Sequence, residues 1–182
     1  MLFRSQSMLQ PGHKRMVFSF RATGEGHISS VVFRRGVLDH NCELQLSKVG
    51  TDIDMPEISH KKLYDKGRFL AKLHEMHIPK KYSTSIMQGL PEKFEYYALK
   101  NSVENLLATN SIGVERRMAL EEITWLVDSF YDLKFHHDAD ITERVIFPIS
   151  HSESRGIEDA RFTCFKEDGK ACRIYATYTA YN

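Results

Sequence analysis

The sequence lacks an excess of charge of either sign. Its 182 residues include 25 Lys and Arg against 24 Asp and Glu, so the formal net charge is +1. Proteins that hold nucleic acids by neutralising phosphates are strongly basic, and we therefore expect no nucleic-acid partner. The hydrophobic fraction of 42% and the charged fraction of 27% are typical of a folded globular chain rather than a disordered one.

Long apolar runs and cysteine motifs are missing as well. No run approaches the roughly 20 apolar residues that span a bilayer, and the start, MLFRSQSMLQPGHKRM, lacks the apolar stretch of a secretory signal. The three cysteines, Cys42, Cys164 and Cys172, show no CxxC spacing, and there is no Asn-x-Ser/Thr site. These absences predict no membrane partner, a reduced cytoplasmic location, and cysteines that act as small core residues.

Strand patterns occupy both ends of the chain. Cys42, Leu44 and Leu46 alternate with polar residues, which predicts a strand with one buried face. Asp168-Gly169 between two strand-like runs predicts a hairpin. The other predicted strands are Val17–Phe20, Ser30–Phe33, Val145–Ile149, Arg161–Phe165 and Arg173–Tyr181.

Between residues 60 and 133 the apolar period becomes helical, and three helices are predicted. The first helix ends at Pro79, because proline cannot continue a helix. Pro91 is typical of a first helical turn and opens the second, and Asn110 or Ser111 is a suitable N-cap for the third. The aromatic residues of this segment are interpreted as core, and its mixed charges as a solvated face.

Two motif-like patterns do not predict a site. Gly24–Gly26 begins like a dinucleotide-binding loop, but the residues after it read as a strand, whereas that loop must open a helix. His74 and His77, and the adjacent pair His136–His137, lack the third ligand and the defined geometry of a metal site. No metal or cofactor is therefore expected.

The segment His151–Arg161 differs in kind from the rest of the chain. It places three carboxylates and two guanidiniums between two apolar strands, with Gly156 available for close backbone approach or a positive φ. Functional groups concentrate on loops that rigid strands hold, and neighbouring arginines change the pKa of a carboxyl group. Composition alone also fits a solvated salt-bridge turn, so both interpretations stay open.

Gly156-Ile157-Glu158-Asp159-Ala160-Arg161, followed by the strand Tyr175–Tyr181, resembles the Gly-x-Glu-Asp-Pro-Arg segment and tyrosine-rich strand of glycoside hydrolase family 130. Gly24–Gly36 is also similar to the first-blade strand and turn of relatives that carry helices near the N-terminus. This family comprises β-mannoside phosphorylases and β-mannosidases built on a five-bladed β-propeller. Ala160 stands where the family has proline, which relaxes the backbone and removes no functional group.

The resemblance implies inverting transfer of a mannosyl group from a β-mannoside or manno-oligosaccharide to inorganic phosphate, which acts as co-substrate. Asp159 would be the general acid, delivering its proton to the glycosidic oxygen through a hydroxyl of the mannosyl unit. Glu158, Arg161 and Arg155 would bind the substrate. Adjacent residues of an extended segment point to opposite sides, so we expect only Asp159, and not Glu158, to face the sugar.

The predicted fold is mainly β with a helical insertion: about the first two blades of a five-bladed propeller, plus a three-helix segment. Residues 1–55 would form the first propeller strands, 56–135 the helical insertion, and 136–182 the strands that carry the motif. Five blades need about 200–250 residues, so we expect one incomplete domain from the N-terminal portion of a larger enzyme.

Three other functions fit the same residues. The first is a β-mannosidase, which hydrolyses the same substrates on the same fold. The second is a non-catalytic sugar-binding module, and the third is a helical interaction module whose partner would contact the segment 60–133. Self-association into a homo-oligomer is left open by the sequence.

Overall fold

The computed structural model describes residues 13–108, 113–166 and 173–182. The chain divides into two compact units. A strand unit contains the chain up to Glu57 and from Phe135 onward, and a helical unit contains Ile58–Lys134.

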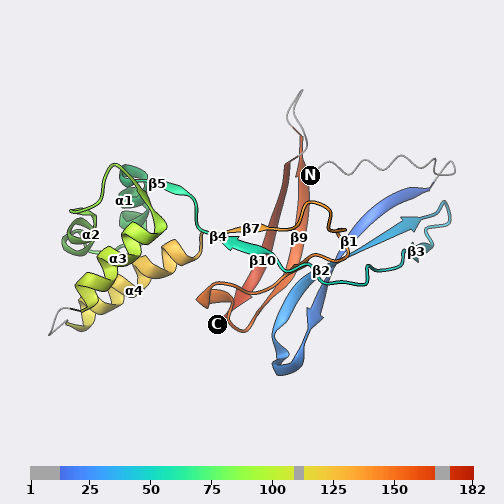
Figure 1. Cartoon of the computed structure of the whole chain (residues 1–182), viewed down its shortest axis with the longest axis horizontal. Coiled ribbons are helices and arrows are strands. Elements are labelled where there is room, and N and C mark those ends of the chain that lie inside the picture. The colour runs from blue at the N-terminus through green and yellow to red at the C-terminus, as the bar shows by residue number, and fades with distance from the viewer. Residues whose placement is uncertain (1–12, 109–112, 167–172) are drawn as a thin grey trace. The chain divides into compact units, whose positions relative to one another are not determined.

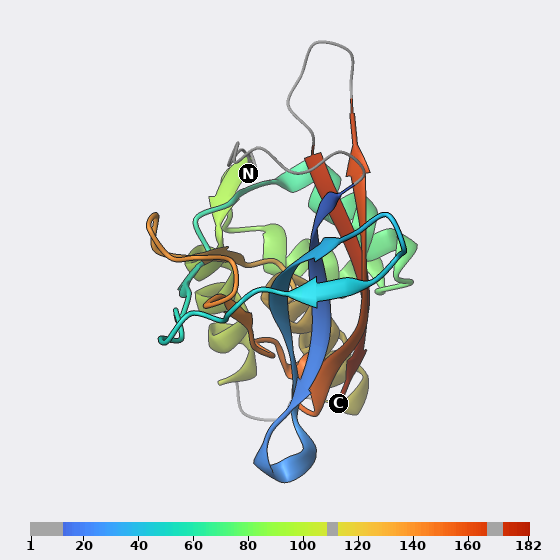
Figure 2. The same cartoon turned by 90° about the vertical axis from the view of Figure 1, so that its right-hand side faces the viewer.

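The strand unit is built on two long hairpins that belong to one open sheet (Figures 1 and 2). The first hairpin pairs β1 (Lys14–Thr23) with β2 (Ser29–Leu38) in antiparallel register. Its turn is the short 3-10 helix Glu25–His27, in which Gly26 has a φ of +80°, and a strand follows directly. The glycine-rich segment is therefore a turn between strands, as the sequence predicts.

The second hairpin pairs β9 (Gly156–Phe165) with β10 (Arg173–Tyr181), again antiparallel. The strand order is β1-β2-β9-β10, and β2 meets β9 through the single parallel pair Ser29 and Gly156. From that meeting point the two hairpins diverge (Figure 1). Two short strands, β3 (Leu44–Leu46) and β8 (Val145–Ile146), also pair with β2.

Three predictions for the strand unit are wrong. Leu44 and Leu46 are both exposed, so β3 has no buried face. Cys42 is an exposed free thiol rather than a core residue, and Cys164 is exposed and disulfide-bonded. A disulfide is typical of oxidising compartments, so the cytoplasmic location stays a prediction; Cys172 and the Asp-Gly turn lie outside the described residues.

The helical unit contains four described α-helices and two small two-stranded sheets. Strand β4 (Glu57–Ser59) pairs with β7 (Asp132–Lys134), and β5 (Leu63–Asp65) with β6 (Lys93–Glu95). The helices are α1 (Lys66–Glu75), α2 (Lys80–Met87), α3 (Tyr96–Leu107) and α4 (Val114–Asp128). No described helix combines the length and the apolar composition that crossing a lipid bilayer requires.

The helix boundaries correct the sequence prediction in two places. Helix α2 was not predicted, because it is only two turns long and mostly polar. Pro91 does not open a helix, since Phe94 pairs with Tyr64 of β5 and keeps the backbone extended up to Tyr96, where α3 begins. The predicted caps Asn110 and Ser111 lie outside the described residues.

Most of the buried apolar side chains belong to the helical unit. One cluster joins all four helices to β5 and β6. It contains Tyr64, Phe69, Leu73, Ile78, Ile86, Met87, Leu90, Phe94, Leu99, Val103, Ala119, Leu120, Ile123, Leu126 and Val127. The chain as a whole is mainly β, with four helices and open sheets in its described part.

Candidate functional site: a cleft between β1 and β9

The motif segment enters the sheet at Gly156, and only glycine fits there. Gly156 has a φ of +129°, a region that L side chains rarely adopt. A Cβ at this position would lie 2.4 Å from Oγ of Ser29 and 2.7 Å from its backbone nitrogen. Both reasons that the sequence suggests for this glycine, close backbone approach and positive φ, are thus confirmed, and together they fix the register between β2 and β9.

The motif itself lies in a strand rather than in the predicted loop. Strand β9 starts at Gly156, and the pairing with β10 shifts between Glu158 and Arg161, where Asp159 and Ala160 together oppose Tyr178. Asp159 has a φ of +51°, in the left-handed region that Asp tolerates better than most residues. The segment is a β-bulge, which redirects side chains at the point where it occurs.

The bulge opens onto a cleft of about 300 Å³. Half of its lining comes from β9 and the other half from β1 and β2. The lining residues are Ser19, Phe20, Arg21, Val31, Glu158, Asp159, Ala160 and Arg161. The lining therefore includes two acidic and two basic residues, a combination that suits a ligand rich in hydroxyl or anionic groups.

Both motif residues, Glu158 and Asp159, line this cleft, and the expectation that their side chains face opposite sides stays a prediction. The expectation assumed an unbroken strand with strict alternation. The bulge adds one residue to β9: Glu158 pairs with Thr179 and Arg161 with Thr177, so Glu158 and Arg161 share a face, while Asp159 and Ala160 oppose Tyr178. The sequence carries no direct signal for this extra residue.

Glu158 is held in place by two partners. Its Oε2 forms an ion pair with Nη1 of Arg21 at 2.8 Å, and its Oε1 accepts a hydrogen bond from Oγ of Ser29 at 3.3 Å. Only 18% of the Glu158 side chain is exposed, against 50% for Arg21. Because both oxygens are engaged, Glu158 is oriented before any ligand arrives.

Asp159 and Arg161 are placed differently. Both are exposed and both line the cleft. Within the part of the chain that the structure describes, neither side chain makes an ion pair, and no hydrogen bond fixes the Asp159 carboxylate. These two groups are therefore the ones available to an incoming ligand.

Arg155 does not join the cleft. Its side chain is exposed, and its backbone N–H donates to the carbonyl of Tyr181 at 2.9 Å, which ties the start of β9 to the end of β10. The residues that the sequence analysis missed are Ser19, Phe20 and Arg21 of β1 and Val31 of β2. They lie far from the motif in sequence, and Arg21 directly follows the predicted strand Val17–Phe20 with no local pattern that marks it as part of a site.

A buried carboxylate supports the bulge from outside the cleft. Glu153, in the 3-10 helix His151–Glu153, is 2% exposed and accepts hydrogen bonds from the backbone nitrogens of Ile149 and Ser150. It also accepts from the hydroxyl of Tyr178, the residue opposite the bulge. A buried carboxylate needs such donors, and here they connect the segment before β9 to the middle of β10.

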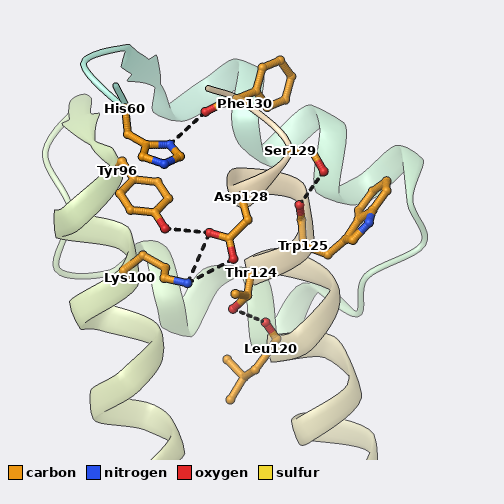
Figure 3. A network of polar contacts seen from close by, with 9 residues as sticks. All are labelled: His60, Tyr96, Lys100, Leu120, Thr124, Trp125, Asp128, Ser129 and Phe130. Carbon is orange, nitrogen blue, oxygen red and sulfur yellow. Dashed lines mark hydrogen bonds and ion pairs between the residues drawn. The ribbon is translucent and has the colours of Figure 1, made fainter. Parts of the chain in front are cut away.

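A second polar cluster, in the helical unit, has the character of a structural network (Figure 3). Asp128 at the end of α4 accepts from the hydroxyl of Tyr96 at 2.8 Å and from Nζ of Lys100 at 3.1 Å, while His60 stacks on Tyr96. Burial, followed by the bond to Asp128, raises the pKa of Tyr96 far above its usual range. This phenol stays a donor and cannot serve as a base, so the cluster joins α3 to α4.

The histidine pairs do not form metal sites among the described residues, where no three His, Cys, Asp or Glu side chains gather as ligands. His136 instead pairs with Asp54, and His137 with the exposed Asp138. Comparisons with protein families, with curated proteins and with solved structures found no match to this chain.

Proposed function

We propose that the cleft between β1 and β9 binds a β-mannoside and that Asp159 acts as general acid in transfer of the mannosyl group to phosphate. The observation that carries the proposal is the contrast between the two motif carboxylates. Glu158 is fixed by Arg21 and Ser29, whereas Asp159 lines the same cleft and its carboxylate has no partner among the described residues. A proton donor needs that freedom to meet a substrate oxygen.

One protein carboxyl group is enough for transfer of the mannosyl group to phosphate. The Asp159 carboxyl gives its proton, through a sugar hydroxyl, to the glycosidic oxygen as the bond from that oxygen to C1 of mannose breaks. A phosphate oxygen forms the new bond to C1 from the opposite face and yields mannose 1-phosphate. Phosphate is already anionic, so no second carboxylate has to activate it. Arg161 is available for sugar hydroxyls or for phosphate, and Phe20 offers an apolar surface to a sugar ring.

Asp159 is exposed without ligand, whereas a general acid must hold its proton near neutral pH. The sugar itself would supply the required burial by covering the cleft. On this proposal the open sheet is part of a five-bladed propeller, and β10, exposed along its whole length, is a strand that further blades would cover. The predicted cytoplasmic location belongs to the same proposal.

The test incubates the full 182-residue chain with phosphate and a panel of β-linked mannobioses, and measures mannose 1-phosphate. We expect Asp159→Asn to lower the rate by about 100-fold or more, since general acids contribute about 10² to 10⁴. Glu158→Gln should mainly raise KM, because it loses the ion pair that orients the cleft. Asp138→Asn, at a fully exposed carboxylate outside the cleft, is the matched control and should change nothing.

The outcomes separate the alternatives. Free mannose in place of mannose 1-phosphate would make the protein a β-mannosidase. Binding of mannobiose, seen as amide shifts at residues 158–161 without any product, would overturn the enzyme proposal in favour of a sugar-binding module. Absence of both binding and product would overturn the whole proposal.

A further inference from the structure

A second cleft, of about 260 Å³, lies in the helical unit, and the proposed function does not use it. It is bounded by β5, the first turns of α1 and the end of α4 with the residues after it. Its lining residues are Lys62, Leu63, Tyr64, Asp65, Arg68, Phe69, Lys72, Leu126 and Phe130. A cleft of this size accommodates a molecule built on one or two rings.

The inner surface of this second cleft is apolar. Tyr64, Phe69 and Leu126 are buried members of the helical core, and their rings and methyl groups form its floor. Leu63 is 57% exposed and Phe130 43% exposed, and these two form its walls. Large apolar side chains that are half exposed beside a buried apolar floor leave apolar surface in contact with water. The hydrophobic effect favours a ligand that covers this surface.

The rim of the second cleft is positive. Lys62, Arg68 and Lys72 all line it, against the single carboxylate of Asp65. That carboxylate is already used as the N-cap of α1, where it accepts from the backbone nitrogen of Arg68 at 2.9 Å. Lys72 pairs with Glu75 at 3.0 Å, while the Arg68 guanidinium makes no ion pair with any residue that the structure describes. An anion at this rim would meet a cation that has no other counter-ion.

The floor also holds a donor without an acceptor. Tyr64 is 7% exposed, and its hydroxyl has no hydrogen-bond partner within the described ranges. Burial, and then Asp128 and Asp132, raise the pKa of Tyr64, so the phenol keeps its proton. This hydroxyl has almost no accessible surface, so it lies beneath the floor and does not itself contact a ligand in the cleft.

We propose that this second cleft is a binding site for a small apolar carboxylic acid, whose ring or chain lies against Phe69, Leu126 and Phe130 while its carboxylate meets Arg68. The apolar floor excludes a sugar or a nucleotide, which would leave its polar groups unpaired. The positive rim disfavours an amine. The volume limits the occupant to a small molecule, and neither the mannoside nor the phosphate chemistry of the other cleft is involved.

The test titrates the full chain with 2-naphthoate and with its neutral analogue 2-naphthamide, and follows backbone amide shifts. At low salt the carboxylate should bind about threefold more tightly than the amide, since one exposed ion pair strengthens binding only modestly. The shifts should centre on residues 62–72 and 126–130. Added salt should remove the preference and leave the affinity for the amide unchanged.

Two arginine variants make the test specific. Arg68→Gln should abolish the preference for the carboxylate, whereas Arg117→Gln, at an exposed arginine of α4 that does not line the cleft, should preserve it. Leu63→Ser, in the exposed wall, should weaken both compounds alike. The proposal is overturned by equal affinity for acid and amide at low salt, by equal effects of the two arginine variants, by shifts centred elsewhere, or by no binding up to about 5 mM.

Discussion

The two units of this chain distribute burial in opposite ways. In the helical unit, fifteen apolar residues from four helices, two strands and the segments that connect them form one buried cluster. In the strand unit, β10 is exposed at every residue, and several of the most buried side chains, among them Ser29 and Glu153, are polar. The helical unit is thus held by apolar packing, and the strand unit by its ladder and by specific polar contacts.

This difference shows where each unit is sensitive to substitution. A packed apolar core loses stability whenever volume is removed from it. A sheet with exposed faces tolerates changes at most side chains and fails at the few places where the backbone is constrained. The proposed mannoside cleft lies on the second kind of framework, beside the constrained positions Gly156 and Asp159.

The largest expected effect is in the helical core. Ile123 in α4 is fully buried among the other helices, and Ile123→Ala should lower the free energy of unfolding by about 2–5 kcal/mol. Tyr175 in β10 is exposed, and Tyr175→Ala should cost less than about 1 kcal/mol. Urea unfolding followed by circular dichroism at 222 nm measures the first change, because the four described helices dominate that signal.

Trp125, the single tryptophan, provides the control for that comparison. It lies in α4, so its fluorescence should report the transition of the helical unit and move with Ile123→Ala. An effect of Tyr175→Ala as large as that of Ile123→Ala would contradict the contrast between the units.

The helical unit was also the easier part to predict from the sequence. The structure buries Leu73, Leu120, Ile123 and Val127, which recur at helical spacing in the sequence. A helix with one buried face places an apolar residue on that face every three or four positions, so the sequence shows this period. Helix α2 escaped prediction because two polar turns carry too few apolar positions to show that period. The alternation of apolar and polar residues wrongly predicted burial of Leu44 and Leu46, which are exposed on a strand of only three residues.

The candidate site was predictable only along the motif itself. Glu158, Asp159 and Arg161 line the cleft, but Arg155 does not, since its part is to tie β9 to β10 through its backbone. Arg21 could not be identified, because it comes from a strand more than 130 residues away, and pairing across that distance leaves no local pattern. The bulge at Asp159 results from register between β9 and β10, which no single strand encodes.

The next largest effect is expected at Gly156, where the backbone of the strand unit is constrained. Gly156→Ala places a Cβ 2.4 Å from Oγ of Ser29 at a φ of +129°, and should destabilise this unit by about 2–3 kcal/mol. The displaced Ser29 would also lose its hydrogen bond to Glu158, so sugar binding should weaken. Amide hydrogen exchange of β2, β9 and β10 measures the destabilisation.

The control for Gly156→Ala is Gly89→Ala, at a helical-unit glycine whose added Cβ would meet nothing within 4 Å. The Trp125 transition should be unchanged in Gly156→Ala, since Trp125 lies in the other unit, and in Gly89→Ala, since the added Cβ meets nothing. Unchanged exchange in β9 would show that the contact with Ser29 does not constrain the strand unit.

The smallest effect is a pH dependence in the strand unit. Nδ1 of His136 lies 2.6 Å from Oδ1 of Asp54, whose Oδ2 accepts from the backbone nitrogen of His136 at 3.0 Å. The bond to Asp54 raises the pKa of His136 above its ordinary 6.5, and the bond to His136 lowers the pKa of Asp54 below 3.8. The contribution of protonated His136 to the free energy of unfolding is complete below pH 6.5 and is lost as the pH rises through the raised pKa of His136. The aspartate contribution is complete above pH 3.8 and is lost as the pH falls through its lowered pKa, so the pair stabilises most between these two values.

His136→Asn should therefore reduce stability most at about pH 5–6, with the difference from the wild type shrinking toward pH 8 and toward pH 3. Thermal unfolding across this range measures it, with hydrogen exchange of residues 54 and 136 to localise the change. His137→Asn is the matched control, because His137 and its partner Asp138 are both fully solvated and their pair should contribute little at any pH. A stability difference that does not vary with pH would show that the His136 ring acts by packing rather than by charge. An equal effect of His137→Asn would show that the pH dependence does not come from the pair of His136 with Asp54.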